Sequence, residues 1–174
     1  MRIQLLAAGF ALLLPLSAMA AGEDDAGSGD TATQCKNGEI WDKEAKKCVP
    51  PQRGMIDDES IYEGGRDLAA IGSYEEAIAV LKLAKNQDDP RILNYLGYAN
   101  RKAGRIEEGL TYYRRALEAN PDYTLAREYL GEAHLLLGDV ASAREQLSEI
   151  GKRCGEGCKE FAVLASQIEA YTKG

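Results

Sequence analysis

The sequence is poor in the residues that usually perform catalysis. It contains one histidine, His134, among 174 residues, so no pool of candidates exists for a Ser-His-Asp or Cys-His arrangement. No glycine-rich phosphate loop precedes an expected helix, because the glycines fall at turns. Acidic pairs such as Glu75-Glu76 and Glu107-Glu108 stand at expected helix starts, where they complement the helix dipole. We therefore expect no catalytic residue and do not predict an enzyme.

Positive charge is also scarce. The chain has 21 Lys and Arg against 28 Asp and Glu, a formal net charge of −7, and no Lys/Arg stripe compensates for it. An acidic surface repels phosphate backbones, so nucleic acid is excluded as an expected partner.

Long apolar runs are limited to the first residues. Arg2 precedes an apolar run from Leu5 to Leu16, and Ala18-Met19-Ala20 follows it. The run is shorter than the roughly 20 residues of a membrane-spanning helix, and the pattern is typical of a secretory signal peptide cleaved near Ala20. An uncleaved anchor is the alternative. We expect a periplasmic or secreted protein without stable membrane insertion.

Cysteines are few and even in number: Cys35, Cys48, Cys154 and Cys158. In an exported chain they indicate disulfides with three possible pairings, of which we favour the local pairs Cys35–Cys48 and Cys154–Cys158. The wide spacing of the first pair is unlike zinc knuckles, so neither a metal nor another cofactor is expected. Cys154 and Cys158 have three residues between them, not the two of thioredoxin-like motifs. A structural staple is favoured, and a redox-active or accessory thiol function is the alternative.

Composition divides the chain beyond residue 20 into four parts. Residues 21–34 are acidic and rich in small residues, which predicts a disordered tether. Residues 35–48 form a small loop closed by its cysteines, and this closure stabilises the segment by roughly 3 kcal/mol. Residues 49–56 contain tandem prolines and are interpreted as a linker. Residues 57–174 carry apolar residues at helical spacing and form the main domain.

The main domain is internally repetitive. Gly72, Gly104 and Gly138 mark turns that are 32 and 34 residues apart. They divide the domain into three helix pairs and a final amphipathic helix, over Glu59–Asn86, Arg91–Ala119, Thr124 to about Lys152, and Cys158–Tyr171. Ser73 followed by Glu76 predicts a capping box at the second helix of the first pair.

The repeats resemble tetratricopeptide repeats over roughly residues 57–155. The matching positions are Leu96-Gly97, Gly104, Tyr113, Ala116 and Pro121 in the second pair; Leu130-Gly131, Gly138, Ala143 and Leu147 in the third; and Gly65, Gly72, Ala77, Leu81 and Ala84 in the first. Gly64 and Gly109 depart from the family, which has leucine and alanine there. The resemblance implies an all-α, right-handed helical solenoid of about three helix pairs. It places His134 in an interior-facing slot, which favours packing, and makes the last helix a cap over part of Leu135-Leu136-Leu137.

The resemblance also implies a function. Members of this family contact partners mainly through the first helix of each pair, along a concave groove, so we expect a non-catalytic scaffold that binds a peptide or a partner helix. The corresponding positions are Tyr62, Arg66, Arg91, Asn94, Tyr98, Arg101, Lys102, Glu128, Glu132 and Leu135. The Lys/Asn/Arg pattern of the family's carboxylate clamp is not matched.

Three alternatives for the binding surface stay open. In the first, the groove positions are ordinary solvated side chains. In the second, the Cys35–Cys48 loop contacts a cell-wall glycan or a partner. In the third, the tether folds back and places Glu23, Asp24 and Asp25 against the groove.

Overall fold

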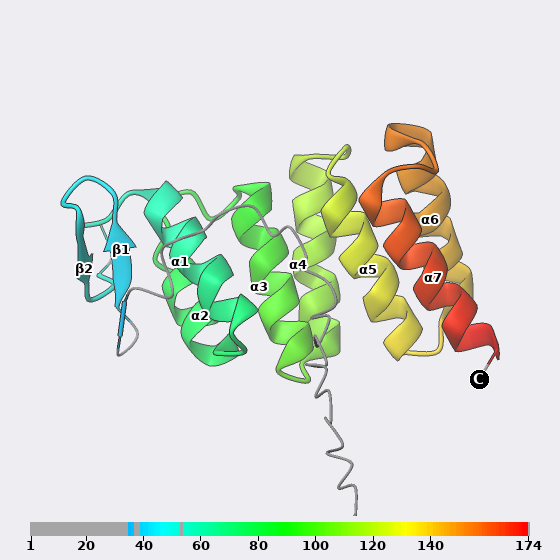
Figure 1. Cartoon of the computed structure of the whole chain (residues 1–174), viewed down its shortest axis with the longest axis horizontal. Coiled ribbons are helices and arrows are strands. Elements are labelled where there is room, and N and C mark those ends of the chain that lie inside the picture. The colour runs from blue at the N-terminus through cyan, green and yellow to red at the C-terminus, as the bar shows by residue number, and fades with distance from the viewer. Residues whose placement is uncertain (1–34, 37–38, 53, 174) are drawn as a thin grey trace, which may run out of the picture.

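The computed structural model describes residues 35–36, 39–52 and 54–173. The signal peptide and the tether predicted for residues 1–34 lie outside the described part. Within the described part, two strands and seven helices follow one another along the long axis of the molecule (Figure 1). They are β1 (Ile40–Asp42), β2 (Lys47–Val49), α1 (Asp58–Ala70), α2 (Tyr74–Leu81), α3 (Pro90–Lys102), α4 (Ile106–Ala119), α5 (Thr124–Leu136), α6 (Val140–Cys154) and α7 (Lys159–Lys173).

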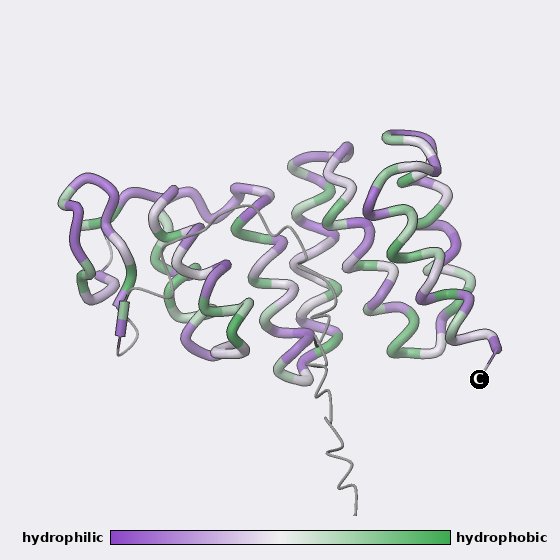
Figure 2. The backbone as a smooth tube through the Cα atoms, viewed as in Figure 1, coloured by the Kyte–Doolittle hydropathy of each residue, from purple (hydrophilic) through white to green (hydrophobic). Residues whose placement is uncertain are grey.

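The helices form an all-α solenoid of three pairs, α1–α2, α3–α4 and α5–α6, followed by α7, as the sequence predicts. Apolar and polar stretches alternate along the helices (Figure 2), because each helix has one packed side and one side that faces water. None of the helices between residues 35 and 173 is both long and apolar enough to cross a membrane.

Turns and caps define where the helices begin and end. Gly72, Gly104 and Gly138 have φ angles of 86°, 86° and 78°, which L side chains rarely adopt. Asp57 caps α1 by accepting a hydrogen bond from the Ser60 amide. The capping box predicted at α2 does not form, because the Ser73 side chain accepts no capping hydrogen bond.

Close helix contact depends on glycines that leave no room for a side chain. A Cβ atom on Gly97 of α3 would lie 2.6 Å from the buried ring of Tyr113 on α4. A Cβ on Gly109 of α4 would lie 2.9 Å from the Gly97 carbonyl oxygen and 3.1 Å from Arg101 Cβ. The two helices therefore touch at their backbones, which explains why glycine replaces the family's alanine at position 109.

The cysteine-closed loop is part of the solenoid and not a separate unit. Its two strands pair antiparallel, and Ile40 of β1 is buried in the same core cluster as Ile61 of α1. A Cβ on Gly64 would lie 2.6 Å from Ile40 Cγ2, so the second departure from the family pattern creates the space that Ile40 fills. Lys43 also pairs with Glu63 at 2.5 Å. The hairpin thus caps the first repeat.

The segment assigned as a linker contributes to this same core. Ile56 is 3% exposed and belongs to the cluster that holds Ile40. The predicted boundary between residues 49–56 and the helical domain is therefore not a boundary in packing.

Helix α7 covers the other end of the solenoid. A Cβ on Gly131 of α5 would lie 2.6 Å from Leu164 of α7, and Leu164 and Leu135 share one core cluster. Leu136 and Leu137 remain 58% and 46% exposed. The cap therefore covers only the first of the three leucines.

Candidate functional site

The candidate site is the surface formed by the first helices of the pairs, which we call the groove face. It consists of the side chains that α1, α3 and α5 present at the positions derived from the repeat pattern. α1 contacts α3, α3 contacts α5, and α5 contacts α7, so these helices form one continuous layer. The surface therefore joins residues that are up to 73 positions apart, from Tyr62 to Leu135.

Four half-buried tyrosines form the centre of the groove face, and we call them the tyrosine row: Tyr62, Tyr95, Tyr98 and Tyr129. The ring centroids are 5.8 Å apart for Tyr62 and Tyr95, 6.2 Å for Tyr95 and Tyr98, and 5.1 Å for Tyr98 and Tyr129. These separations fall in the range of favourable aromatic pairs. Burial raises the pKa of Tyr95 to about 12, so the row is uncharged at neutral pH.

Tyr62 and Tyr98 were predicted from the sequence, and Tyr95 and Tyr129 were not. The signal was present, because Tyr62, Tyr95 and Tyr129 are separated by 33 and 34 residues, the length of the repeat. One tyrosine thus returns at nearly the same place on the first helix of each pair.

The arginines at the α1 end of the row are already paired within the chain. Arg66 contacts Asp67 at 2.8 Å. Arg91 contacts Glu59 at 2.8 Å and Asp89 at 2.9 Å, and its guanidinium carbon lies 4.6 Å from the centroid of the Tyr62 ring. These hydrogen bonds to Asp89 raise the pKa of Arg91 further above its ordinary value. The positive charges of Arg66 and Arg91 are therefore largely neutralised within the chain.

Arg101 is a buried connector and not a free contact residue. It is 7% exposed, its Nε donates to the Tyr113 hydroxyl at 3.1 Å, and its Nη2 lies 2.6 Å from Glu132 Oε2. Its guanidinium carbon is also 5.5 Å from the Tyr98 ring and 5.6 Å from the Tyr129 ring. Every face of this side chain is therefore engaged in holding α3, α4 and α5 together.

The next cation on α3 is placed differently. Lys102 is exposed, and its ammonium nitrogen lies 5.9 Å from the centroid of the Tyr98 ring. Of the cations predicted for the groove, it is the one that meets solvent most freely.

Asn94 lies between Arg91 and Tyr98 at helical spacing on α3. It is fully buried, and neither its Nδ2 nor its Oδ1 has a hydrogen-bond partner. The prediction that Asn94 contacts a peptide is untested, and in this structure its side chain is covered.

Carboxyl groups gather where α5 meets α7, and we call this cluster the acidic end: Glu128, Glu132 and Glu160. Glu128 is 6% exposed. Burial, followed by the charges of Glu132 and Glu160, raises the pKa of Glu128 to about 7. Glu132 forms an ion pair with Arg101. It also accepts a hydrogen bond from Gln167 Nε2, which lies 2.5 Å from Glu132 Oε1.

A small pocket of about 240 Å³ opens beside the acidic end. Arg101, Glu132, Leu135, Leu136 and Gln167 line it. Gln167 of α7 was not predicted, because it lies outside the three repeats and reaches the groove face only through the packing of the cap.

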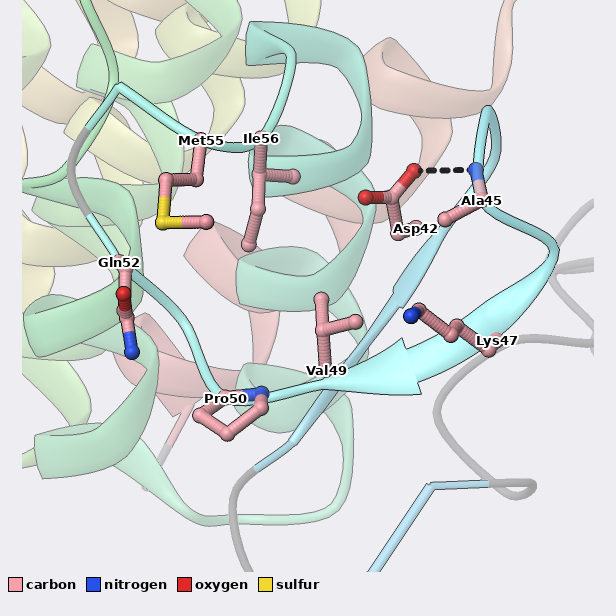
Figure 3. Close-up of a pocket in the computed structure, with 8 residues that line it drawn as sticks. All are labelled: Asp42, Ala45, Lys47, Val49, Pro50, Gln52, Met55 and Ile56. Atoms are coloured by element: carbon pink, nitrogen blue, oxygen red, sulfur yellow. Dashed lines mark hydrogen bonds between the residues drawn. The ribbon is translucent and has the colours of Figure 1, made fainter.

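A second pocket, of about 330 Å³, lies between the hairpin and the segment that follows it (Figure 3). It is lined by Asp42, Ala45, Lys47, Val49, Pro50, Gln52, Met55 and Ile56. Its one carboxylate, Asp42, accepts from the backbone amides of Glu44 and Ala45 at 2.9 Å each and so holds the hairpin turn. The lining therefore offers no pair of groups arranged for proton transfer.

The cysteines and the histidine occupy structural positions. Disulfides join Cys35 to Cys48 and Cys154 to Cys158, the pairing favoured from the sequence. The sulfurs of Cys154 and Cys158 and a carboxylate oxygen of Glu160 lie within 4.8 Å of one another, but both sulfurs are bonded to each other. His134 is half-buried with Nδ1 3.4 Å from Asp139, the residue that caps α6. It therefore supports the α5–α6 turn.

Comparison with solved structures finds the same fold in proteins of low sequence identity. The first tetratricopeptide domain of RPAP3 bound to an HSP90 peptide is 17% identical with a TM-score of 0.59, covering 68% of this chain and 94% of that chain. The type III secretion translocator chaperone SycD of Yersinia enterocolitica is 20% identical with a TM-score of 0.58, covering 66% and 83%. The same chaperone in complex with a peptide of the translocator YopD is 20% identical with a TM-score of 0.56, covering 66% and 88%.

The family itself is shown by the sequence match. No curated protein sequence matches the chain, but the tetratricopeptide repeat model matches residues 62–123 and 96–153. Together the two matches span more than half of the chain, and they cover the helices that carry the tyrosine row. The protein therefore belongs to the tetratricopeptide repeat family.

Proposed function

We propose that the protein is a non-catalytic interaction scaffold whose groove face binds a peptide or a partner helix. The tyrosine row is the observation that carries this proposal. Tyrosine and arginine are the residue types enriched at binding hot spots, and here four half-buried tyrosines form a continuous surface over three repeats. The complexes of RPAP3 with an HSP90 peptide and of SycD with a YopD peptide support it as examples on the same fold.

The groove face is also arranged to bind at low entropic cost. Arg91 is fixed by Glu59 and Asp89 beneath Tyr62, and Arg101 is fixed by Tyr113 and Glu132. Side chains that are ordered before a ligand arrives lose little freedom when it binds. The aromatic surface is therefore pre-organised.

We propose further that the protein acts in the periplasm or outside the cell. The signal-peptide pattern of residues 1–20 supports this location, as do the two disulfides, which persist in oxidising compartments. Cell fractionation and N-terminal sequencing of the mature protein test it. A mature chain that begins at Ala21 in the soluble envelope or medium fraction is the expected result, and a chain that retains Met1 contradicts it.

Site-specific photocrosslinking in the native cell tests the groove face. The crosslinker p-benzoylphenylalanine replaces Tyr62 or Tyr98 in the row and, as a control, exposed Thr111 on α4. We expect the same partner from both tyrosine positions and not from Thr111. A second control position is Met55 beside the hairpin pocket. A partner captured equally well from Thr111, or only from Met55, would move the site away from the groove face.

A further inference from the structure

We propose that the acidic end of the groove face binds a lysine or arginine side chain of the partner peptide, while the tyrosine row binds the adjoining apolar residues. This inference rests on the proposed function, because it specifies the ligand of that same surface. It assigns the peptide a composition and places its cation at the α5–α7 end of the groove face.

The first argument is an unpaired carboxyl group. Glu128 is 6% exposed, and no hydrogen bond or ion pair to its side chain is found among the residues that the structure describes. Buried polar groups nearly always have a partner, since burial without one is costly. The unpartnered atoms that are fully enclosed belong to Asn94 and Gln167, so the carboxyl group of Glu128 keeps an open side, where a ligand can supply the partner that the described residues do not.

The second argument is the charge around Glu128. Glu132 stands one helical turn away on α5, and Glu160 faces it from α7. The nearby cations are Arg101 on α3, which is occupied by Glu132 and Tyr113, and Lys159 on α7, which is exposed. Arg101 and Glu132 are occupied by each other, which leaves the carboxyl groups of Glu128 and Glu160 beside one exposed cation, Lys159. A cationic side chain from a ligand complements this imbalance, and an anionic one is repelled.

The third argument comes from the opposite end of the groove face. Arg66 and Arg91 are paired with Asp67, and with Glu59 and Asp89. Among the groove positions predicted from the sequence, only Lys102 is an exposed cation, and it lies against Tyr98. The surface therefore lacks the free positive charge that an acidic peptide requires, which favours a ligand that is apolar over the tyrosines and basic beside α7.

Proton linkage gives the proposal a quantitative signature. Because the pKa of Glu128 in the free protein is about 7, the group is about half protonated at neutral pH. A cation that binds beside it favours the ionised form, so binding releases a proton and tightens as pH rises. From pH 6 to pH 8 the ionised fraction rises from about one eleventh to about ten elevenths, which predicts roughly tenfold tighter binding. The charged groups that face Glu128 are Glu132, Glu160, Lys159 and Arg101.

Selection from a random library of displayed 12-residue peptides tests the proposal. The bait proteins are the wild type, Glu128→Gln, and Glu145→Gln, a control at an exposed position on α6. We expect the wild type and Glu145→Gln to enrich peptides with Lys or Arg next to aromatic or aliphatic residues, and Glu128→Gln to enrich apolar peptides without the basic preference. For one selected peptide, replacing its Lys by norleucine should weaken wild-type binding about tenfold and change Glu128→Gln binding little.

The outcomes separate the two proposals. Enriched peptides with the same composition for wild type and Glu128→Gln, or a pH dependence that Glu128→Gln retains, would overturn the cation site and leave the groove face standing. Enriched peptides that photocrosslink only outside Tyr62 and Tyr98 would overturn the groove face itself and the cation site with it.

Discussion

Replacing Glu128 by Gln is expected to stabilise the protein increasingly as pH rises from about 4.5 to 7. The folded protein buries this carboxyl among Glu132 and Glu160, which raises its pKa from an ordinary 4.5 to about 7. Between these values the folded state holds the proton while the unfolded state has lost it. The free energy of unfolding of the wild type therefore falls through this window and levels off above it.

The size of the effect follows from the shift. Each pKa unit corresponds to about 1.4 kcal/mol, so a shift from 4.5 to about 7 destabilises the wild type by at most about 3 to 4 kcal/mol well above pH 7. Glutamine keeps the shape of the side chain and carries no charge at any pH. We expect it to remove most of this loss, because a neutral amide at the same place avoids both the desolvated charge and the repulsion from Glu132.

The assay is equilibrium urea unfolding at pH 5, 6, 7 and 8, without added reductant or oxidant, so that both disulfides stay intact. The informative quantity is the free energy of unfolding of Glu128→Gln minus that of the wild type, with Glu145→Gln as the matched loss of an exposed carboxylate. The difference should grow by about 1 kcal/mol per pH unit between pH 5 and 6 and change little above pH 7.5. A difference that is flat with pH, or that shrinks as pH rises, would refute the argument.

Three further predictions concern side-chain packing and one buried ion pair. Gly97→Ala should lower the free energy of unfolding, measured by thermal melts, by roughly 1–3 kcal/mol, because the new methyl group meets the Tyr113 ring and the Gly109 carbonyl oxygen. As a control, Gly157→Ala should be nearly neutral in the same melts, because its methyl group meets nothing within 4 Å. Ile40→Ala should lower the free energy of unfolding by about 2–4 kcal/mol and increase the rate of amide hydrogen exchange in α1. An unchanged exchange rate in α1 would mean that the hairpin does not cap the first repeat. Glu132→Gln should lower the free energy of unfolding by roughly 3 kcal/mol, because it leaves Arg101 buried without its counter-charge. If the two side chains interact directly, adding Arg101→Met to Glu132→Gln should recover much of that loss in a double-mutant cycle.

Local residue chemistry was sufficient to predict the helices of this protein. Gly72, Gly104 and Gly138 end the first helices because they adopt positive φ angles, and the apolar spacing between them dictates which side of each helix is packed. The family and the solenoid follow from that repetition, since a helix pair with one apolar side must stack on another. Three of the four tyrosines in the row, Tyr62, Tyr95 and Tyr129, also repeat along the sequence at intervals of 33 and 34 residues.

Contacts between distant segments were beyond the same reasoning. Nothing within residues 35–48 indicates that Ile40 fills the space above Gly64, because that contact depends on two segments 24 positions apart. The capping box at Ser73 was predicted from a local motif, but the side-chain geometry of the folded turn does not form it. The last helix was predicted to cover part of Leu135-Leu136-Leu137, but only the packing of α7 shows that the covered residue is Leu135.

The sequence by itself determined the fold and the location of the groove face, because both depend on periods that a single helix expresses along its own length. Only the tertiary structure decided the electrostatic character of that face. Arg91 and Arg101 are 32 and 31 positions from Glu59 and Glu132 in the sequence, but packing of the first helices brings each pair into contact. Folding also buries most of Glu128 and gives its carboxyl group no ion pair among the described residues. The physical reason is that charge pairing and desolvation depend on distances of a few ångströms between helices, and those distances exist only after the repeats have packed.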